Sequence, residues 1–510
     1  MKLSELLKDS GVLCPAEIQN KEFTGIEYDS RKIQSGNLFV CLTGEHTDGA
    51  VYAADAEFRG AAAVLAEESL SDLSVPVLHT EDSRRALSIL AANFYGRPSQ
   101  KLRMFGVTGT NGKTTVSYMV RAALEADGKT CGLVGTVGYH TGKRRLESGR
   151  TTPESRDLQE LLSKMLEDGA DCCSMEVSSH ALDLGRVRNV RFDYGIFTNL
   201  TQDHMDFHKD WEAYYQAKKK LFYLAEKGAC INTDDPAGAR LLEKLKKEYE
   251  ENGRSLVSYS LKDRNADFFG EIANLGEKGS VLKIEKRGIE LGEIEVRIPG
   301  RFMACNALAA VACCEVAGVP FCAVQKGIGA LKGVPGRLER VPNDLGISIY
   351  IDFAHTPDAV EHVLEAANEM AGPDRRILTV FGCGGDRDRE KRPMMGKAAG
   401  INSDYCIVTS DNPRNEKQEE ISAAIEEGLY ETDCSYESIP DRRQAIRRAL
   451  ELAEPGDFIL LLGKGHEEGQ TIGGSTVYFN DKETVLELLR DPALKDKTVC
   501  GEDRFSAERI

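Results

Sequence analysis

The stretch Met104–Val120, MFGVTGTNGKTTVSYMV, decides the fold of this chain. An apolar segment, Arg103–Val107, precedes a turn rich in glycine and threonine, and a helical pattern begins at Lys113. A strand, a glycine-rich turn and a helix in this order form a phosphate-binding loop, whose backbone N–H groups and helix N-terminus face phosphate oxygens. The spacing departs from the general pattern, because Val107 stands five residues before Gly112 where that pattern has glycine. The segment TGTNGKTT still predicts a nucleoside triphosphate site.

Within this loop, Lys113 is expected to reach the outer phosphates of the nucleotide, and the Thr114 hydroxyl is expected to hold Mg²⁺. The loop residues predicted to bind ATP are Gly109, Thr110, Asn111, Gly112, Lys113, Thr114 and Thr115.

Composition narrows the class of protein. The chain has 510 residues and a formal charge of -17, which disfavours a nucleic-acid or anionic-membrane surface. Its 14 cysteines include no C-x-x-C pair, so reduced buried thiols are expected rather than disulfides or zinc ligands. The N-terminus has no apolar signal core, and no run approaches the roughly 20 apolar residues of a membrane span. We therefore expect a cytoplasmic protein that inserts into no membrane and binds no nucleic acid, and we expect a monomer.

Periodicity predicts an α/β protein of three domains, bounded at residues 1–99, 100–332 and 333–510. A small N-terminal α/β domain precedes a central, doubly wound phosphate-loop domain, and a C-terminal Rossmann-like domain follows. A hairpin appendage is expected between about residues 270 and 298. Strands are expected at Asn37–Leu42, Val75–His79, Arg103–Val107, Cys131–Val134, Cys172–Val177, Tyr194–Thr198, Ala229–Asn232, Ile347–Ile351, Ile377–Phe381, Tyr405–Thr409 and Phe458–Leu462.

Two strand ends of the central domain carry residues suited to a Mg²⁺-nucleotide site. Glu176 lies on an apolar strand, and His204 lies in the polar loop after Thr198. In the helix predicted for Trp211–Glu226, Lys218 falls in the middle of an apolar face that includes Trp211. Two interpretations stay open at this stage: a buried amine with a depressed pKa, or a lysine whose stem covers its neighbours while its head reaches solvent.

The C-terminal unit has four apolar strands that each end in a polar or glycine-rich segment. Because the carboxyl ends of parallel strands meet at one edge, these segments predict a second ligand-binding edge. The segments are Asp352–His355, Gly382–Asp388, Ser410–Arg414 and Gly463–Glu467.

Taken together, these motifs resemble the Mur ligases, cytoplasmic ATP-dependent enzymes that build the peptide of bacterial cell-wall precursors. The resemblance covers nearly the whole chain, and the motifs stand in the family's order: Thr108–Thr115, Glu176–His180, Thr198–His204, Ala217–Lys218, Arg337, Asp352–His355 and Asp411–Arg414. It implies an ATP-dependent ligase that adds meso-diaminopimelate to UDP-N-acetylmuramoyl-L-Ala-D-Glu through an acyl phosphate, for peptidoglycan synthesis. Its implied catalytic residues are Lys113, Glu176, His204 and Lys218.

The same resemblance implies further site residues. Mg²⁺ would be held by Thr114 and Glu176, and a second Mg²⁺ by His204 and Lys218, the latter as N6-carboxylysine. Three more residues are implied at the nucleotide: Asn306, Arg337 and His355. The UDP-precursor residues would be Ser30, Thr151, Thr152, Ser178 and Arg186. The meso-diaminopimelate residues would be Arg387, Asp411, Asn412, Pro413, Arg414, Gly463 and Glu467.

The sequence departs from the family pattern at three positions. Arg150 stands where many relatives have Asn, Leu184 stands where some have Gln, and Met303 replaces a family Asn. Arg414 matches the diaminopimelate-adding members. Diaminopimelate carries a carboxylate beside its distal amine, which a guanidinium can bind, whereas lysine would leave the arginine unpaired at a cost of about 2–5 kcal/mol.

Two alternative functions compete with this one. Folylpolyglutamate synthase shares the phosphate-loop domain and the lysine, but the N-terminal domain and Asp411–Arg414 argue against it. A phosphate-loop ATPase that drives motion or partner binding would hydrolyse ATP without a UDP-sugar peptide. A purely structural role is disfavoured by the charged groups at so many strand ends.

Overall fold

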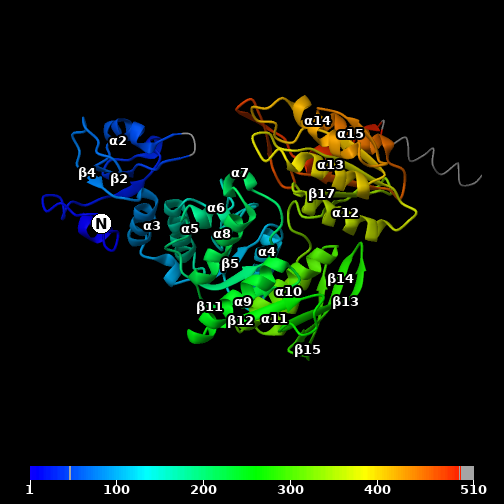
Figure 1. Cartoon of the computed structure of the whole chain (residues 1–510), viewed down its shortest axis with the longest axis horizontal. Helices are drawn as coiled ribbons and strands as arrows, with labels where there is room; N and C mark the ends of the chain where they lie inside the picture. The colour runs from blue at the N-terminus through cyan, green and yellow to red at the C-terminus, as the bar shows by residue number, and fades with distance from the viewer. Residues whose placement is uncertain (45–46, 493, 495–510) are drawn as a thin grey trace, which may run out of the picture.

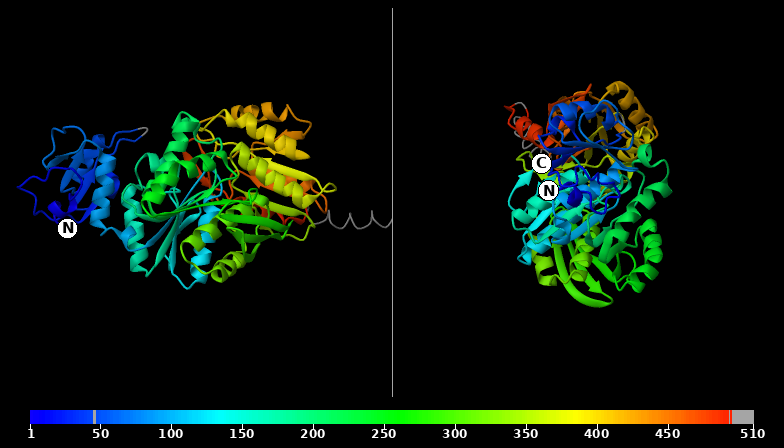
Figure 2. Two further views of the ribbon diagram at one scale, coloured as in Figure 1. Left: turned by 60° about the horizontal axis from the view of Figure 1, so that its bottom comes forward. Right: turned by 90° about the vertical axis from the view of Figure 1, so that its left-hand side faces the viewer.

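The computed structural model describes residues 1–44, 47–492 and 494. It has three α/β domains that follow one another along the chain, with the central domain between the other two (Figures 1 and 2). This confirms the predicted fold class. The polar tail from residue 495 onward lies outside the described residues.

The N-terminal domain is built on a parallel sheet with the order β1-β2-β3-β4. Two of these strands, β1 and β3, were not predicted from the sequence. One apolar cluster packs α1 and α3 on the sheet, and a second packs α2 on its other face. The elements are α1 (Leu3–Leu6), β1 (Gly25–Glu27), the 3₁₀ helix η1 (Ser30–Lys32), β2 (Asn37–Val40), η2 (Gly49–Tyr52), α2 (Ala53–Phe58), β3 (Ala63–Ala66), β4 (Val77–His79), α3 (Ser83–Phe94) and η3 (Pro98–Gln100).

The central sheet has 11 strands in the order β15-β14-β13-β12-β11-β10-β5-β9-β6-β7-β8. Its middle, from β6 to β13, is parallel, and both edges are antiparallel. The strands are β5 (Arg103–Thr108), β6 (Cys131–Gly135), β7 (Gly138–His140), β8 (Arg145–Leu146), β9 (Cys172–Glu176), β10 (Phe192–Phe197), β11 (Ala225–Asn232), β12 (Ser255–Ser260), β13 (Phe268–Gly276), β14 (Gly279–Lys286) and β15 (Ile289–Val296).

Helices cover both faces of this sheet, as expected for a doubly wound domain. Helices α4, α10 and α11 contribute to one apolar cluster, and α5, α6, α8 and α9 to another. Alternate residues of β5 enter different clusters, because successive side chains of a strand point to opposite faces. The helices are α4 (Lys113–Ala126), α5 (Ser155–Glu167), α6 (Ser179–Asp183), α7 (Met205–His208), α8 (Trp211–Leu224), α9 (Pro236–Glu251), α10 (Arg301–Val316) and α11 (Phe321–Ala330).

The C-terminal sheet has the order β16-β17-β21-β18-β19-β20 and is parallel except for β16. A separate hairpin, β22 and β23, follows it. The elements are β16 (Glu339–Val341), β17 (Ser348–Asp352), α12 (Pro357–Ala371), β18 (Ile377–Phe381), α13 (Lys391–Asn402), β19 (Tyr405–Val408), α14 (Gln418–Leu429), β20 (Ser435–Ser438), α15 (Arg442–Leu452), β21 (Phe458–Leu462), β22 (Gly469–Ile472), β23 (Ser475–Tyr478) and α16 (Asp481–Leu488).

The predicted appendage between residues 270 and 298 proves to be part of the central sheet. Strand β13 pairs with β12, and β14 and β15 extend the same sheet. Its first turn reaches the C-terminal domain through Glu277. The Glu277 carboxylate accepts hydrogen bonds from Ser348 Oγ (2.8 Å) and Tyr350 OH (3.4 Å) and pairs with Arg340 (3.2 Å). The hairpin therefore connects two domains.

The apolar face predicted for α8 is confirmed except at its first residue. Tyr214, Tyr215, Leu221 and Phe222 are buried, but Trp211 is 41% exposed and stacks on Tyr215. Trp211 is the first residue of α8, and the prediction that it is buried was wrong.

Candidate active site

The phosphate loop joins β5 to α4, and its two glycines are required by close contacts. Gly109 has φ +155°, and a Cβ there would lie 1.8 Å from Thr198 Oγ1. Gly112 has φ +87°, and a Cβ there would lie 2.4 Å from Asn306 Oδ1. A larger residue at either position would push the loop away from β10 or α10. The structure thus places Asn306, a residue implied at the nucleotide, directly against the loop.

Lys113 begins α4 and folds back over the loop. Its Nζ donates hydrogen bonds to the carbonyl oxygens of Gly109 (2.9 Å) and Thr110 (2.8 Å). Burial lowers the pKa of this amine, and the neighbouring Glu176 and Asp203 carboxylates oppose that effect. A cation held by carbonyl groups inside a phosphate loop is positioned to exchange them for phosphate oxygens.

Glu176 ends β9 beside the loop and is 1% exposed. Its carboxylate accepts hydrogen bonds from the N–H (2.8 Å) and the Oγ1 (3.1 Å) of Thr136. Across the loop, the Thr114 hydroxyl accepts a hydrogen bond from Arg337 Nη2 at 2.9 Å. Arg337 follows α11 and precedes β16, so this bond ties the C-terminal domain to the phosphate loop. Thr115, also predicted at the nucleotide, is buried in the first turn of α4.

The Lys218 side chain is buried, which decides between the two interpretations that the helical face left open. It is 1% exposed, which excludes the interpretation that its head reaches solvent. Its Nζ donates to the Gly109 carbonyl at 2.7 Å and lies 4.3 Å from the centre of the Tyr214 ring. Burial lowers the pKa of the amine well below its usual value, and Lys113 adds to that effect. The lysine therefore faces the phosphate loop with an amine that loses its proton readily.

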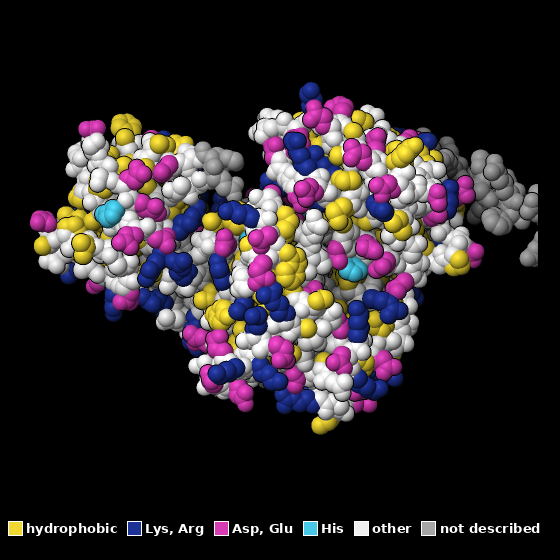
Figure 3. Space-filling model, in the orientation of Figure 1, with side chains coloured by type: hydrophobic (Ala, Val, Ile, Leu, Met, Phe, Trp, Pro, Cys, Tyr) yellow, Lys and Arg dark blue, Asp and Glu magenta, His cyan; other side chains and the backbone are white. Residues whose placement is uncertain are grey.

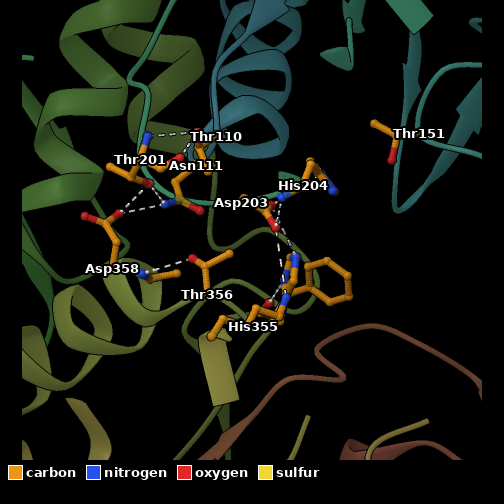
Figure 4. A network of polar contacts seen from close by, with 12 residues as sticks. Thr110, Asn111, Thr151, Thr201, Asp203, His204, His355, Thr356 and Asp358 are labelled. Atoms are coloured by element: carbon orange, nitrogen blue, oxygen red, sulfur yellow. Dashed lines mark hydrogen bonds and ion pairs between the residues drawn. The ribbon is translucent and has the colours of Figure 1, made fainter. Parts of the chain in front are cut away.

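Asp203, in the loop after β10, is the centre of an ionic network that Figure 4 shows. Its carboxylate lies 3.3 Å from His204 Nε2, 4.0 Å from His355 Nε2 and 3.9 Å from Lys391 Nζ. Burial alone would raise the pKa of Asp203, but its interactions with these three side chains, and with Lys113, hold it below its usual range. Burial lowers the pKa of His204 to about 3, so this imidazole is neutral near pH 7 and can donate a lone pair to a metal.

A second contact between domains lies beside this network (Figure 4). Asp358, in the first turn of α12, accepts hydrogen bonds from Asn111 Nδ2 (2.8 Å) and Thr201 Oγ1 (3.3 Å). The nucleotide-binding loop and the C-terminal domain therefore contact each other through side chains of both. Sequence reasoning missed Asp203, Lys391 and Asp358 as site residues, since their contacts join segments far apart in the chain.

The residues beside the phosphate loop offer few protein ligands for Mg²⁺. Among the described residues, no group of three or more His, Cys, Asp or Glu side chains could hold a metal. Glu176 and Thr114 offer oxygen atoms, which Mg²⁺ prefers, and Mg²⁺ commonly keeps several waters and substrate phosphates as ligands. The residues thus fit an ion that is completed by nucleotide oxygens, with His204 and Lys218 beside it.

The residues implied for the UDP-precursor lie in two domains. Ser30 begins η1 of the N-terminal domain, whereas Thr151, Thr152, Ser178 and Arg186 belong to the central domain. Thr152 Oγ1 donates to the Glu176 carbonyl (2.8 Å) and accepts from the Ser178 N–H (3.1 Å). Arg186 donates to the Thr152 carbonyl (3.3 Å). Thr151 is bonded instead to Thr136 (3.0 Å), a partner of Glu176. The four central residues therefore form one connected group beside Glu176.

A cavity of about 160 Å³ lies between the central and C-terminal domains. It brings together most of the residues implied for meso-diaminopimelate, namely Arg387, Asp411, Asn412, Arg414, Gly463 and Glu467. Asp203, His204, His355 and Lys391 line the same cavity. Pro413 is not among the lining residues; its carbonyl packs against Gly385, where a Cβ would lie 1.9 Å away.

Two cations inside this cavity are held by neutral groups. Arg414 Nη1 donates to the carbonyls of Gly385 (2.7 Å) and Asn412 (3.4 Å), and Arg387 donates to the Asp386 carbonyl (2.8 Å). Burial lowers the pKa of Arg414, and the Arg387 charge lowers it further. Lys464, by contrast, is fully buried and bonded to Glu467 (2.9 Å) and Asn412 (3.4 Å). The two arginines therefore offer positive charge to a ligand carboxylate.

This fold and site define a three-domain phosphate-loop protein with a nucleotide site in one domain and an amino-acid-sized cavity where that domain meets the next. Family models match in all three domains: "Mur ligase family, catalytic domain" over residues 22–95, "Mur ligase middle domain" over 107–314 and "Mur ligase, glutamate ligase domain" over 336–465. The chain belongs to the Mur ligase family. No helix among the described residues is long and apolar enough to cross a membrane.

Individual relatives match over the full length. The chain is 42% identical, over 98% of its own length and 100% of the relative, to a UDP-N-acetylmuramoyl-L-alanyl-D-glutamate–2,6-diaminopimelate ligase of Alkaliphilus metalliredigens. It is 41% identical, over 96% and 99%, to the Clostridioides difficile protein of the same name. A solved structure of a ligase with this name has a TM-score of 0.66 and 31% identity, covering 96% of this chain and 98% of the other.

Proposed function

We propose that this protein is an ATP-dependent ligase that joins meso-diaminopimelate to UDP-N-acetylmuramoyl-L-Ala-D-Glu, in the cytoplasm, during peptidoglycan precursor synthesis. The observation that carries the proposal is one cavity, lined both by the two arginines Arg387 and Arg414 and by Asp203 and His204 of the phosphate-loop domain. The curated relatives described above bear the name of this reaction.

The first step is transfer of the ATP γ-phosphoryl group to the side-chain carboxylate of D-glutamate, with departure of ADP. Two anions approach each other in this step, so cations lower its barrier. Lys113 supplies one such charge, and Mg²⁺ held by Thr114 and Glu176 would supply more. The N-terminus of α4, with the backbone N–H groups of its first turn, would orient the phosphates.

The second step forms the amide bond. The diaminopimelate amine attacks the acyl carbon, a tetrahedral intermediate forms, and the bond to phosphate breaks while the nitrogen loses its proton. Contacts of Arg337 and Asp358 with the phosphate loop hold the C-terminal domain against it. Such closure excludes water, which would otherwise hydrolyse the acyl phosphate.

Lys218 has a particular part in this proposal. A neutral amine adds CO₂ to give a carbamate anion and a proton, so the buried side chain would become an anion. The burial of Lys218 and its lowered pKa favour the neutral amine that this addition requires. The carbamate and His204 would then hold a second Mg²⁺ beside the phosphate loop.

ADP release by the purified protein tests the proposal, with Mg²⁺, ATP and the UDP-precursor, and with meso-diaminopimelate or L-lysine as the amine. Mass spectrometry identifies the product. We expect turnover that requires the precursor and diaminopimelate together. ATP hydrolysis that is indifferent to the precursor would instead support a phosphate-loop ATPase, and turnover with lysine alone would overturn the role of Arg414.

A further inference from the structure

Three arginines converge on one carboxylate where the N-terminal domain meets the central domain. Glu154 Oε2 lies 3.2 Å from Arg84 Nη1, 3.7 Å from Arg150 Nη1 and 3.3 Å from Arg186 Nε. Arg84 belongs to α3 of the N-terminal domain, whereas the other residues belong to the central domain. Figure 3 shows Lys and Arg side chains gathered along this junction.

The charges of this cluster do not balance. Glu154 is the one ion-pair partner found for each of the three arginines among the described residues, so three positive charges share one negative charge. Glu154 is 4% exposed and its other oxygen accepts the Ser155 N–H at 3.0 Å, which fixes it at the start of α5. Two positive charges therefore stay uncompensated at a partly buried site, an arrangement suited to an anion with two negative charges.

The cluster is also directly connected to the residues implied for the UDP-precursor. Arg186 donates to the Thr152 carbonyl, and Thr152 contacts Ser178. Arg150 directly precedes Thr151. The side chains of Arg84 and Arg150 are 25% and 54% exposed, so both can reach a ligand, whereas Arg186 is 13% exposed. The diphosphate of a UDP-sugar carries two negative charges, which equals the excess of the cluster.

We propose that Arg84 and Arg150 bind, together with Arg186, the diphosphate of the nucleotide-sugar substrate, and that Glu154 positions all three guanidinium groups. Because Arg84 comes from the N-terminal domain, the bound diphosphate holds that domain against the central one. This inference rests on the proposed function and adds two substrate-binding residues to it. In this proposal, the charged Arg150 side chain binds the diphosphate from the position where many relatives have a neutral Asn.

Charge-removing variants test the inference. Arg84→Met and Arg150→Met keep most of the apolar stem and remove the guanidinium. We expect each variant to raise the KM for UDP-N-acetylmuramoyl-L-Ala-D-Glu about tenfold, and the double variant to raise it more, as for a lost hydrogen bond to a charged group. The KM for ATP and kcat at saturating precursor should stay near their wild-type values, since neither arginine contacts the phosphate loop.

A matched control comes from the same domain junction. Arg188 pairs with Asp82 across it at 3.4 Å, and both side chains are 48% exposed, so its charge is already balanced. Arg188→Met should leave the precursor KM unchanged. Arg84→Lys and Arg150→Lys keep the positive charge and should keep most of the affinity. Thermal unfolding of every variant shows whether it folds.

Two further measurements separate charge from packing. UDP should compete with the precursor less well in the Met variants than in wild type, whereas uridine, which has no phosphate, should compete equally in all of them. When the salt concentration is raised from about 0.05 to about 0.5 M, the KM for the precursor should rise more steeply in the wild type than in the double variant, because salt screens exposed charges.

The outcomes distinguish this inference from the proposed function. If wild-type protein neither binds nor uses the UDP-precursor, the proposed function is wrong. If wild type turns over the precursor but folded Met variants keep its KM, or Lys variants lose as much affinity as Met variants, the diphosphate role of Arg84 and Arg150 is overturned.

Discussion

Replacing Arg414 by methionine should weaken the preference for diaminopimelate over lysine. Arg414 lies in the loop after β19 with φ 51°, a conformation that methionine tolerates better than a β-branched residue. Its guanidinium donates to the Gly385 carbonyl at 2.7 Å beside the Gly384 backbone, and Arg387 lies close enough to depress its pKa. A carboxylate on the substrate would relieve this repulsion between like charges.

The size of the effect follows from these contacts. Arg414 is partly buried, so a hydrogen bond between it and a carboxylate is worth about 1.5–3 kcal/mol rather than the smaller value of an exposed pair. We take about 2 kcal/mol for the substrate carboxylate, which corresponds to a factor of about 30 in kcat/KM. Arg387 remains in the variant and should retain part of the binding.

The assay compares two enzymes with two amine substrates, so that the substrate carboxylate and the arginine are each removed singly and together. In wild type, kcat/KM should be higher for diaminopimelate than for lysine. The ratio of the two values should be about 30-fold smaller in Arg414→Met. Arg389→Met is the control, because Arg389 lies in the neighbouring loop but pairs with Glu416 at 3.0 Å and is 69% exposed. Equal losses for both substrates in Arg414→Met would refute the reasoning.

Two further predictions concern buried ionisable groups. Lys218→Met should lower ADP release at least about a hundredfold while ATP and precursor still bind, because the methionine side chain cannot form a carbamate anion. Native mass spectrometry of the wild-type protein should show one added CO₂. An unmodified protein with full activity would contradict this prediction. His466 contacts the Thr136 carbonyl (3.2 Å), and burial, with the charges of Arg337 and Arg145, lowers its pKa to about 4 against the opposing effect of Glu339. The unfolded state therefore takes up this proton first, and stability should fall as the pH drops from about 6.5 towards 4, by at most about 3 kcal/mol for this group. His466→Gln should flatten that part of the thermal unfolding profile; an unchanged slope would contradict the assignment.

The elements that sequence predicted well are those with strong local patterns. The phosphate loop and α4 follow from glycines between an apolar strand and a helix. Helical periodicity placed Lys218 on the apolar face, but only the structure shows that its amine is buried. The strand predicted at Tyr194–Thr198 instead begins at Phe192, since pairing with β5 and β11 decides where a strand starts.

Contacts between domains were not predictable in this way. Asn111 and Asp358 are separated by 247 positions, and nothing in the local sequence of either indicates the other. The same holds for Asp203 and Lys391, whose ion pair depends on how the C-terminal domain sits. The excess of positive charge at Glu154 likewise becomes visible only when α3 is placed beside α5, although Arg150 already stood out as a departure from the family pattern.

Glu277, at the turn between β13 and β14, lets the central sheet influence the position of the C-terminal domain. Its carboxylate holds the β16–β17 edge of the C-terminal domain, while Arg337 and Asp358 hold that domain near the phosphate loop. The separation of these attachments depends on the number of residues in the hairpin. Lengthening β13 and β14 by one residue pair would therefore tilt the C-terminal domain and change the gap between acyl phosphate and amine. The length of the hairpin would thus help to determine the distance between the reacting groups, and it can change without altering any residue that touches a substrate.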